Sequence, residues 1–405
     1  MAENTISRRK FVSTGAITVS GLATLGLPAF NRSFFNNDIV RVGIIGTGSR
    51  GTGLANLIKD IRGMEVVACC DIIPEHLQNG LKEASKGARA YTDYRKLLED
   101  KSIHAVIIAT PLYLHYPMSV HALEAGKHIY LEKSLAYDIP QCIALVKKVR
   151  NSNLVFQVGY QYRYSRMYHK VKQAIDQKWL GKITHFECQY NRNSNWRFPV
   201  DDPKLERAIN WRMHRVYCGG LLSELCSHQI DQVNYFLGSH PIKVTGIGGI
   251  NYWKDGRDTY DNIRTIYEYT NGVKSSVTSI LSNAFNGYSI RILGDVATVE
   301  IQRDKAFIYA ESTDNAKGIV DGVTGATKNA ITQGKGVELI YDEPGREQTE
   351  PTIDSLIDFL DCIRNNKKPV SNVETARDAS IAVHIGNKAA DTQTFQVWKG
   401  EYSMG

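Results

Sequence analysis

The sequence predicts an α/β fold in two domains: an N-terminal Rossmann domain with a doubly wound parallel sheet, and a C-terminal α+β domain with a large, mostly antiparallel open sheet. Up to about residue 160, short apolar runs alternate with amphipathic helical segments, an order typical of a parallel sheet. From about residue 183, strand-forming runs follow one another with one long helical segment among them. With 405 residues, of which 42% are hydrophobic, the chain is long enough to form two cores.

A glycine-rich turn follows the first predicted strand. Residues Val42–Ile45 are apolar on consecutive positions, as in a strand buried on both faces, and GTGSRG at residues 46–51 comes directly after them. In this G-x-G-x-x-G spacing, Gly46 permits a tight turn, Gly48 lets the backbone approach a pyrophosphate, and Gly51 lets the next helix pack closely on the strand. The amides at the start of that helix are expected to face the phosphates of a dinucleotide.

The second predicted strand, Glu65–Cys70, ends at Asp71. A carboxylate at this position can accept hydrogen bonds from both ribose hydroxyls of NAD, and it repels the 2′-phosphate of NADP. The next residues, Ile72, Ile73 and Pro74, supply no arginine that could bind such a phosphate. The order of strand, glycine turn, helix, strand and acid therefore predicts an NAD site, and it disfavours the alternative of a glycine-rich turn beside an unrelated acid.

Helices and strands continue to alternate after Asp71. Helices are expected over Pro74–Ala84, Tyr94–Leu98, His115–Ala125 and Ile139–Val149, and strands over Ala105–Ala109, His128–Leu131 and Leu154–Val158. In a doubly wound sheet the ligand lies beyond the carboxyl ends of the strands. Together with the three glycines and Asp71, the residues predicted by position to bind the cofactor are Ser49, Arg50, Thr110, Pro111, His115, Glu132, Lys133 and Gln161.

The second domain is expected to be rich in strands. They are predicted over Ile183–Tyr190, Val244–Tyr252, Asn262–Tyr269, Val273–Leu281, Tyr288–Leu293 and Ala297–Ile301, with Asn271-Gly272 as a hairpin turn and one long helix over Gly220–Leu237. Residues 311–350 predict a loop, and Ile353–Arg364 and Glu374–Ala390 predict two helices that can pack on either domain. The expected organisation is a signal and linker (1–37), an NAD-binding domain (38–160), a substrate-binding domain (161–350) and C-terminal helices (351–405).

The N-terminus resembles a twin-arginine export signal. The segment SRRKFV at residues 7–12 carries the paired arginines, and Phe11–Phe30 is an uncharged stretch rich in Gly, Ala, Thr and Leu. This resemblance implies export to the periplasm by the twin-arginine machinery, which carries proteins already folded, often with a cofactor inside. A membrane anchor is the alternative, because the uncharged segment approaches the length that spans a bilayer.

Charge and cysteine usage exclude some classes of function. The formal net charge is +7, of which residues 1–37 carry +3, and the remaining +4 is too small to indicate a nucleic-acid partner. The seven cysteines form no C-x-x-C pair and have no metal-ligand spacing. We therefore expect buried, reduced cysteines and no metal site.

The segment Glu132-Lys133-Ser134 follows a predicted strand at the mouth of the nucleotide domain. A lysine there can point its ammonium at a substrate hydroxyl and stabilise the alkoxide that develops as a hydride leaves the carbon. The alternative is an ordinary surface Glu-Lys pair at a strand end.

The second chemical cluster is GGLLSELCSHQID at residues 219–231. On a regular helix Glu224, His228 and Asp231 share one face. The histidine can take a proton from a hydroxyl, while a neighbouring carboxylate orients the ring and favours its charged form. The alternative is a partly buried histidine whose ring nitrogens are satisfied by the protein.

Taken together, these motifs resemble the Gfo/Idh/MocA family of NAD(P)-dependent oxidoreductases. The resemblance rests on GTGSRG at 46–51, ATPLYLHYP at 109–117, AGKHIYLEKS at 125–134, GYQYRY at 159–164, and the paired glycines, His228 and Asp231 of the later helix. It implies that Lys133 is the lysine of the family's E-K-P element and that His228 is its catalytic histidine. The chain departs from the family in having Glu224 where an aspartate is usual and Ser134 where a proline is usual.

The resemblance implies reversible hydride transfer between NAD and a ring carbon of a sugar, glycoside or cyclitol, with Lys133, His228 and Glu224 as the catalytic residues. A redox-neutral glycosidase that uses tightly bound NAD through a transient keto-sugar is the alternative, and a catalytically silent ligand-binding protein is a third possibility. A homo-oligomer formed through the open sheet is also expected. Besides Lys133 and His228, the residues predicted to contact the substrate are Tyr162, Arg163, Trp196, Arg197, Trp211 and Arg212, with His214 beside them.

Overall fold

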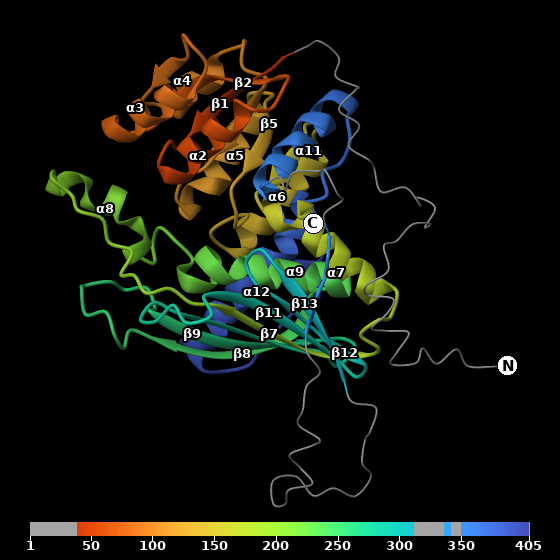
Figure 1. Cartoon of the computed structure of the whole chain (residues 1–405). Helices are drawn as coiled ribbons and strands as arrows, with labels where there is room; N and C mark the ends of the chain where they lie inside the picture. Colours follow the sequence, from red (N-terminus) through yellow and green to blue (C-terminus); the bar gives the residue numbers. More distant parts are fainter. Residues whose placement is uncertain (1–38, 312–335, 342–349, 405) are drawn as a thin grey trace, which may run out of the picture.

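The computed structural model describes residues 39–311, 336–341 and 350–404, and it confirms the predicted fold class. A parallel sheet with helices on both faces lies above a larger sheet, and helices fill the space between the two (Figure 1). The predicted signal over residues 1–37 lies outside the described residues, as does most of the predicted loop over 311–350. Within the described ranges, none of the helices combines the length and the apolar character needed to cross a bilayer.

The first sheet, sheet A, is entirely parallel and has the strand order β3-β2-β1-β4-β5-β6. From β1 to β3 the strands are added towards one edge of the sheet, and from β4 to β6 they are added towards the other. The order therefore reverses between β1 and β4, which is where doubly wound folds bind dinucleotides. The short edge strand β3 was not predicted, because its three residues are largely exposed and carry no apolar run. The strands are β1 (Val40–Ile45), β2 (Met64–Cys70), β3 (Arg89–Tyr91), β4 (Ala105–Ile108), β5 (His128–Leu131) and β6 (Phe156–Val158).

The helices of this domain follow the predicted segments within one or two residues. Asp93 and Asp138 cap two of them by accepting hydrogen bonds from Arg95 N and Gln141 N. The helix after β1 begins without any side-chain cap, and its N-cap residue is Gly48. The helices are α2 (Ser49–Ile58), α3 (Pro74–Glu83), α4 (Tyr94–Glu99), α5 (His115–Glu124) and α6 (Ile139–Arg150), with a 3₁₀ turn at Leu112–Leu114.

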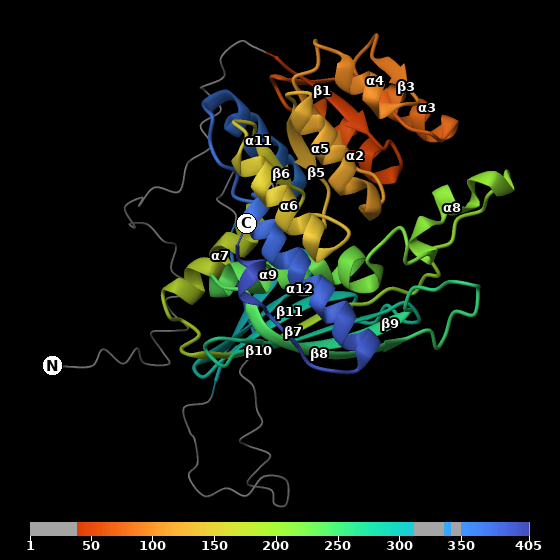
Figure 2. The same cartoon turned by 180° about the vertical axis from the view of Figure 1, so that it is seen from behind.

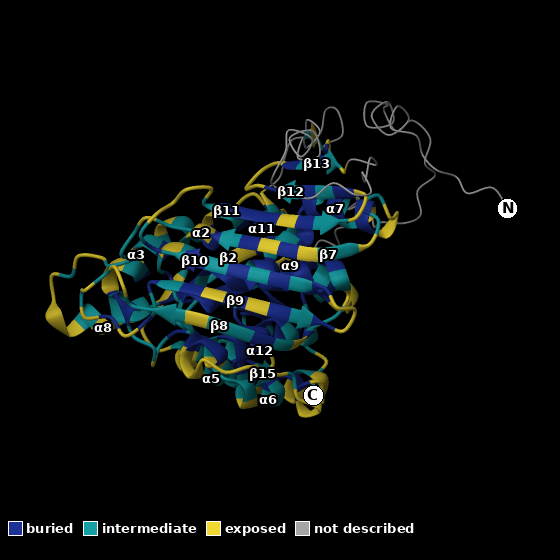
Figure 3. Ribbon diagram, turned by 90° about the horizontal axis from the view of Figure 1, so that it is seen from below, coloured by how far each residue is buried: buried dark blue, intermediate teal, exposed yellow. Residues whose placement is uncertain are grey.

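The second sheet, sheet B, has the order β14-β13-β12-β11-β7-β10-β9-β8-β15 and is antiparallel except where β10 pairs with β7. The strand predicted over Val244–Tyr252 begins and ends three residues earlier, and β13, β14 and β15 were not predicted. Helices cover one face of this sheet, and Figure 3 looks onto its other face, along which exposed and less exposed residues alternate. The strands are β7 (Ile183–Tyr190), β8 (Pro241–Gly249), β9 (Asn262–Tyr269), β10 (Lys274–Ile280), β11 (Tyr288–Gly294), β12 (Ala297–Ile301), β13 (Ala306–Ala310), β14 (Val337–Glu338) and β15 (Gln396–Val397).

The long helix predicted over Gly220–Leu237 contains a π-helical segment, Leu222–Cys226, followed by α9 (Ser227–Leu237). Helix α7 (Arg166–Asp176) was not predicted. Its sequence is polar overall, but one stripe of it is buried against sheet B. Helix α8 (Glu206–Ile209) lies in a segment that projects beside the Rossmann domain (Figures 1 and 2). Further 3₁₀ turns lie at Gln161–Tyr164, Pro203–Leu205, Trp211–Met213 and Gly400–Tyr402.

The C-terminal helices α11 (Pro351–Asn365) and α12 (Val373–Thr392) pack on different parts of the molecule. Helix α11 buries Leu356, Phe359 and Leu360 in the core that β1 and α2 form on one side of sheet A. Helix α12 contacts α6, α9 and β8, so it lies between the two sheets, as Figure 2 shows. All seven cysteines are free and buried, as predicted.

Phe359→Ala tests how much α11 contributes to the nucleotide domain. The Phe359 side chain is fully buried, with its ring edge-on to Tyr130 at 5.7 Å between centroids. Removing it should lower the free energy of unfolding by about 3–5 kcal/mol, since a buried phenylalanine leaves a cavity. Chemical denaturation measures the change, and Phe395→Ala is the control because that ring is 65% exposed. Equal stability of the two variants would mean that α11 is not part of this core.

Candidate active site

The glycine turn has no room for side chains at two of its three positions. Gly46 has φ of 89°, and a Cβ there would lie 2.7 Å from the carbonyl oxygen of Ala109. A Cβ on Gly51 would lie 1.9 Å from the carbonyl oxygen of Gly46, so only glycine lets α2 start this close to the strand end. The turn therefore brings the uncapped N-terminus of α2, with Ser49 and Arg50 in its first turn, to the carboxyl edge of sheet A.

Asp71 holds this turn in place from the end of β2. Its carboxylate accepts hydrogen bonds from the amide of Thr47 at 2.8 Å and from the amide of Ile73 at 2.9 Å. The ring of His76 lies beside the same carboxylate, with 3.8 Å between Nδ1 and Oδ2. An uncapped helix N-terminus, a turn with space beside Gly48 and an acid at the next strand end fit a dinucleotide such as NAD.

The residues predicted at the ends of β4 and β5 do not all face a ligand. Thr110 and Pro111 follow β4 at the carboxyl edge of sheet A. His115 is buried, and its two ring nitrogens lie 3.0 Å from the carbonyl oxygen of Thr110 and 2.7 Å from that of Ser134. His115 thus joins the two strand ends instead of being free to bind the cofactor. The Oε1 atom of Gln161 is buried without a hydrogen-bond partner among the described residues.

Lys133 reaches from the end of β5 into the second domain. Its ammonium donates to the carbonyl oxygen of Glu224 at 2.9 Å and lies 3.3 Å from that of Ser223. The Lys133–Ser134 peptide bond is cis. Burial lowers the pKa of Lys133 below its ordinary value of 10.5, although Glu224 and Glu132 oppose this shift.

The carbonyl groups that bind Lys133 belong to the π-helical segment. In a regular α-helix each of these carbonyls accepts the amide four residues later. The wider π turn changes that pairing and is frequent at functional sites. Ser223 O also accepts the hydroxyl of Ser227 at 2.7 Å. The sequence contains no signal for this segment, because its residues are compatible with an ordinary helix.

His228 lies one turn beyond the residues that bind Lys133. Its Nδ1 atom is buried and has no hydrogen-bond partner among the described residues, and the residue as a whole is only partly buried. The ring contacts Tyr162 at 5.1 Å and lies edge-on to Tyr160 at 6.1 Å between centroids. Burial, together with the charges of Lys133 and Arg50, lowers the pKa of His228 well below 6.5. The imidazole is therefore neutral at neutral pH and can accept a proton through Nε2.

The predicted support of His228 by a neighbouring carboxylate is wrong. The carboxylate of Glu224 pairs with Arg212, with 3.0 Å between Oε2 and Nε. Asp231 is fully buried and binds the guanidinium of Arg163 at 2.8–3.0 Å. Within the described part of the chain no hydrogen bond joins either acid to the imidazole, because the π-helical segment and these arginines direct the carboxylates elsewhere.

The pairing with Asp231 also corrects the expected role of Arg163. Its guanidinium is buried and contacts both carboxylate oxygens of Asp231, and it lies over the ring of Tyr235. This buried ion pair stabilises the placement of α9 relative to the 3₁₀ turn at Gln161–Tyr164. The guanidinium is therefore not available to a sugar. By contrast, the neighbouring Tyr162 lies against His228 and is only partly buried.

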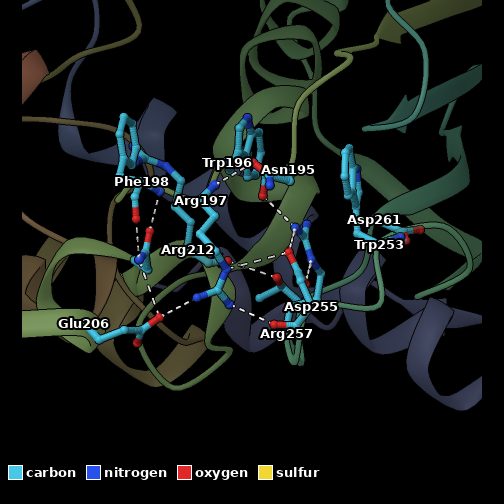
Figure 4. Close-up of polar contacts among 12 residues, drawn as sticks. Asn195, Trp196, Arg197, Phe198, Glu206, Arg212, Trp253, Asp255, Arg257 and Asp261 are labelled. Carbon is cyan, nitrogen blue, oxygen red and sulfur yellow. Dashed lines mark hydrogen bonds and ion pairs between the residues drawn. The ribbon is translucent and has the colours of Figure 1, made fainter. Parts of the chain in front are cut away.

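Figure 4 shows why Arg197 is also better described as structural. Its guanidinium binds Glu206 at 2.7 Å and the carbonyl oxygen of Asp255 at 2.9 Å. Glu206 also lies 3.6 Å from the ring of His214. The same Asp255 binds Arg257, which is buried and donates to the carbonyl oxygen of Asn195 at 2.6 Å. The sequence did not predict a role for Arg257, because its partner Asn195 is 62 residues away along the chain.

The remaining predicted substrate residues lie near this network. Trp196 follows Asn195 and has a positive φ of 61°. Arg212 lies over the ring of Trp211, with 4.1 Å between its Cζ atom and the ring centroid, while its Nε atom binds Glu224. The structure therefore connects Arg212, through Glu224, to the helical segment that binds Lys133. Tyr162, Trp196, Trp211 and Arg212 remain partly exposed and are available to a ligand.

Comparisons with known families identify the two domains. Residues 40–160 match the oxidoreductase family with an NAD-binding Rossmann fold, and residues 168–300 match the GFO/IDH/MocA C-terminal domain. The chain belongs to the GFO/IDH/MocA family of oxidoreductases, as the motifs predicted.

The most similar proteins include dehydrogenases and one glycosidase. The chain is 26% identical to scyllo-inositol 2-dehydrogenase (NAD(+)) of Bacillus subtilis over 87% of this chain and 94% of that protein. It is 27% identical to a glycosyl hydrolase family 109 protein of Shewanella pealeana over 52% of this chain, and the match spans only half of that relative's length. A solved levoglucosan dehydrogenase in complex with NADH and levoglucosan shares the fold, with a TM-score of 0.72 and 20% identity over 89% of this chain and 99% of that one.

The directions of the two pKa shifts predict a bell-shaped pH profile of turnover. His228 must be neutral to accept a proton, so the acidic limb should lie below pH 6.5; Lys133 must be charged to polarise an oxygen, so the alkaline limb should lie below pH 10.5. A pH profile of kcat measures both limbs, and His121→Gln, a change outside the site, should leave them in place. An acidic limb above pH 6.5 would contradict the assignment of His228 as the base.

Proposed function

We propose that this protein is an NAD-dependent oxidoreductase that transfers a hydride between NAD and a ring carbon of a sugar, glycoside or cyclitol. The observation that carries this proposal is the contact of Lys133 with the helical segment of the other domain that carries His228. The ammonium of Lys133 binds carbonyl groups of the helical segment that places His228 one turn later. Lys133 follows β5 at the carboxyl edge of sheet A, to which the glycine turn and Asp71 also belong.

The roles of the two residues follow from their protonation states. NAD, when bound along the glycine turn, supplies the acceptor for the hydride. The positive charge of Lys133 stabilises the substrate oxygen as negative charge develops on it. The neutral imidazole of His228 removes the hydroxyl proton through Nε2. Glu224 acts indirectly, since its carbonyl oxygen fixes Lys133 while its carboxylate fixes Arg212.

The cofactor preference and the location of the protein are part of the same proposal. Asp71 favours NAD over NADP, because a carboxylate at the ribose repels a 2′-phosphate. The paired arginines at residues 8 and 9 support twin-arginine export to the periplasm, with a membrane anchor as the alternative. An exported enzyme has no dissolved pool of NAD to draw on, so tight retention of the cofactor fits this location.

The outer face of sheet B supports the proposal that the chain binds a second copy of itself. This face is not covered by helices of the described chain (Figure 3). It carries exposed apolar side chains, Ile247 on β8 and Ile266 on β9, among charged residues. A homo-oligomer formed through this face would bury them.

The redox-neutral glycosidase remains the second candidate. The similarity to a glycosyl hydrolase family 109 protein favours it, as does the absence of an external NAD supply after export. In this reaction the ring carbon is oxidised, the neighbouring proton becomes acidic, the aglycone is eliminated and the ring carbon is reduced again. No net oxidant is consumed.

Lys133→Met and His228→Ala should each lower turnover at least about 100-fold, since each removes a group that acts on the transition state. Both variants should still bind NAD, because neither side chain is part of the glycine turn. Turnover with candidate cyclitols and sugars, together with NADH binding followed by fluorescence, measures the two effects. Lys82→Met on α3 is the matched control and should retain full activity. Near-normal turnover of either site variant would show that its role has been assigned wrongly.

A burst experiment distinguishes the two candidate reactions. If NAD is retained, substrate oxidation should stop near one equivalent of reduced cofactor per site unless a keto-sugar acceptor is added. Continuous aglycone release without an acceptor, with solvent deuterium entering the carbon next to the oxidised one, would favour the glycosidase. Accumulation of NADH beyond one equivalent in the presence of added NAD would instead indicate a dehydrogenase with a freely exchanging cofactor.

A further inference from the structure

An ion pair crosses the carboxyl edge of sheet A, where the proposed function places NAD. Arg50 lies in the first turn of α2, and its Nε atom donates to Oε1 of Glu132 at 2.7 Å. Glu132 follows β5, whereas α2 follows β1, and in sheet A the strand β4 lies between these two. The pair therefore passes over the carboxyl end of β4. In a doubly wound sheet this is the place where the nicotinamide half of a dinucleotide leaves the glycine turn.

The surroundings of Glu132 hold its carboxylate in position for this pair. Its second oxygen, Oε2, lies 3.3 Å from the backbone amide of Lys133. On its other side a Cβ at Gly159 would lie 2.9 Å from Oε1, so the glycine at this position leaves the space that the carboxylate needs. The side chain of Glu132 is only 10% exposed. Because the side chain is so little exposed, the carboxylate cannot turn away from Arg50 into solvent.

Arg50 is the more exposed partner of the pair. Its side chain is 39% exposed, compared with 10% for Glu132, and its Nη2 atom is enclosed without a hydrogen-bond acceptor among the described residues. The pair thus has a buried half next to β5 and a partly exposed half on α2, and the arginine is the side at which it can open to solvent.

We propose that the Arg50–Glu132 ion pair is a latch over the nicotinamide half of the bound NAD and that it sets how slowly the cofactor leaves. This inference rests on the proposed NAD-dependent function. The glycine turn and the uncapped start of α2 bind the pyrophosphate, and the guanidinium closes the carboxyl edge of sheet A beyond it. Release of NAD requires the pair to open, so Arg50 acts on retention of the cofactor. Its charge also contributes to the low pKa of His228, so the test reads the dissociation rate and not turnover.

The test compares dissociation rates of NADH among variants of the full-length protein. Arg50→Gln and Glu132→Gln should each raise the rate at least about tenfold, because the loss of a hydrogen-bonded charge pair acts mainly on dissociation. The double variant should be no faster than the faster single variant, since both changes break one interaction. Stopped-flow displacement of NADH by excess NAD measures the rates. Arg50→Lys, which keeps the charge but loses the directed Nε donor, should lie between Arg50→Gln and the unaltered protein.

Arg150→Gln is the matched control. Its Nε atom donates to Oε1 of Glu374 at 3.0 Å, so it has the same geometry but connects α6 to the start of α12 instead of α2 to the end of β5. This variant should release NADH at the rate of the unaltered protein. Circular dichroism of every variant verifies that the fold is retained.

Two outcomes would overturn the latch. Unchanged dissociation from a folded Arg50→Gln variant would show that the pair does not restrain the cofactor. Faster dissociation from Arg50→Gln with no effect of Glu132→Gln would show that Arg50 contacts the phosphates directly and that the ion pair is irrelevant. Failure of the unaltered protein to bind NADH at all would overturn the proposed function as well, so the two failures are distinguishable.

Discussion

The ammonium group of Lys133 needs hydrogen-bond acceptors, and the position of these acceptors determines the rest of the site. A partly buried ammonium is costly unless protein groups replace the water that it has lost. Here the carbonyl oxygens of Ser223 and Glu224 do so, from a helical segment that belongs to the other domain. Both carbonyl groups belong to the π-helical part of that segment. One interaction thus joins the two domains, fixes the lysine and places His228 a turn away from it.

The charges around this contact are balanced in pairs. Arg212 forms an ion pair with the carboxylate of Glu224, and Asp231 forms an ion pair with the guanidinium of Arg163. These acids are therefore not free to stabilise a protonated imidazole, and the cations Lys133 and Arg50 keep the pKa of His228 low. The arrangement gives a neutral base beside a positive charge, which is the combination that removes a proton from a hydroxyl while stabilising its oxygen.

The features predicted well from the sequence depend on neighbouring residues. The spacing of Gly46, Gly48 and Gly51 and the position of Asp71 follow from one strand, one turn and the start of one helix, and the structure shows the close backbone contacts that Gly46 and Gly51 permit. The pairing of Arg163 with Asp231 joins residues 68 positions apart, so no pattern of neighbouring residues predicts it. Helical periodicity placed Glu224 and Asp231 on the face of His228, but it contains no information on which distant arginine takes each carboxylate. The π-helical segment could not be predicted either, because the same residues are compatible with an α-helix and with a π-helix.

The contribution of α11 to the nucleotide domain has a consequence for how the protein is made. Its residues Leu356, Phe359 and Leu360 complete a core that otherwise consists of segments before residue 160. During synthesis on the ribosome the first domain emerges with this side of its sheet uncovered, and it stays so until some 200 further residues have been added, which takes on the order of ten to forty seconds. For that time its apolar surface is open to chaperones and to aggregation. The last helices of the chain therefore decide when the first domain is finished, and a ribosome that stalls late leaves a nucleotide domain without its cover.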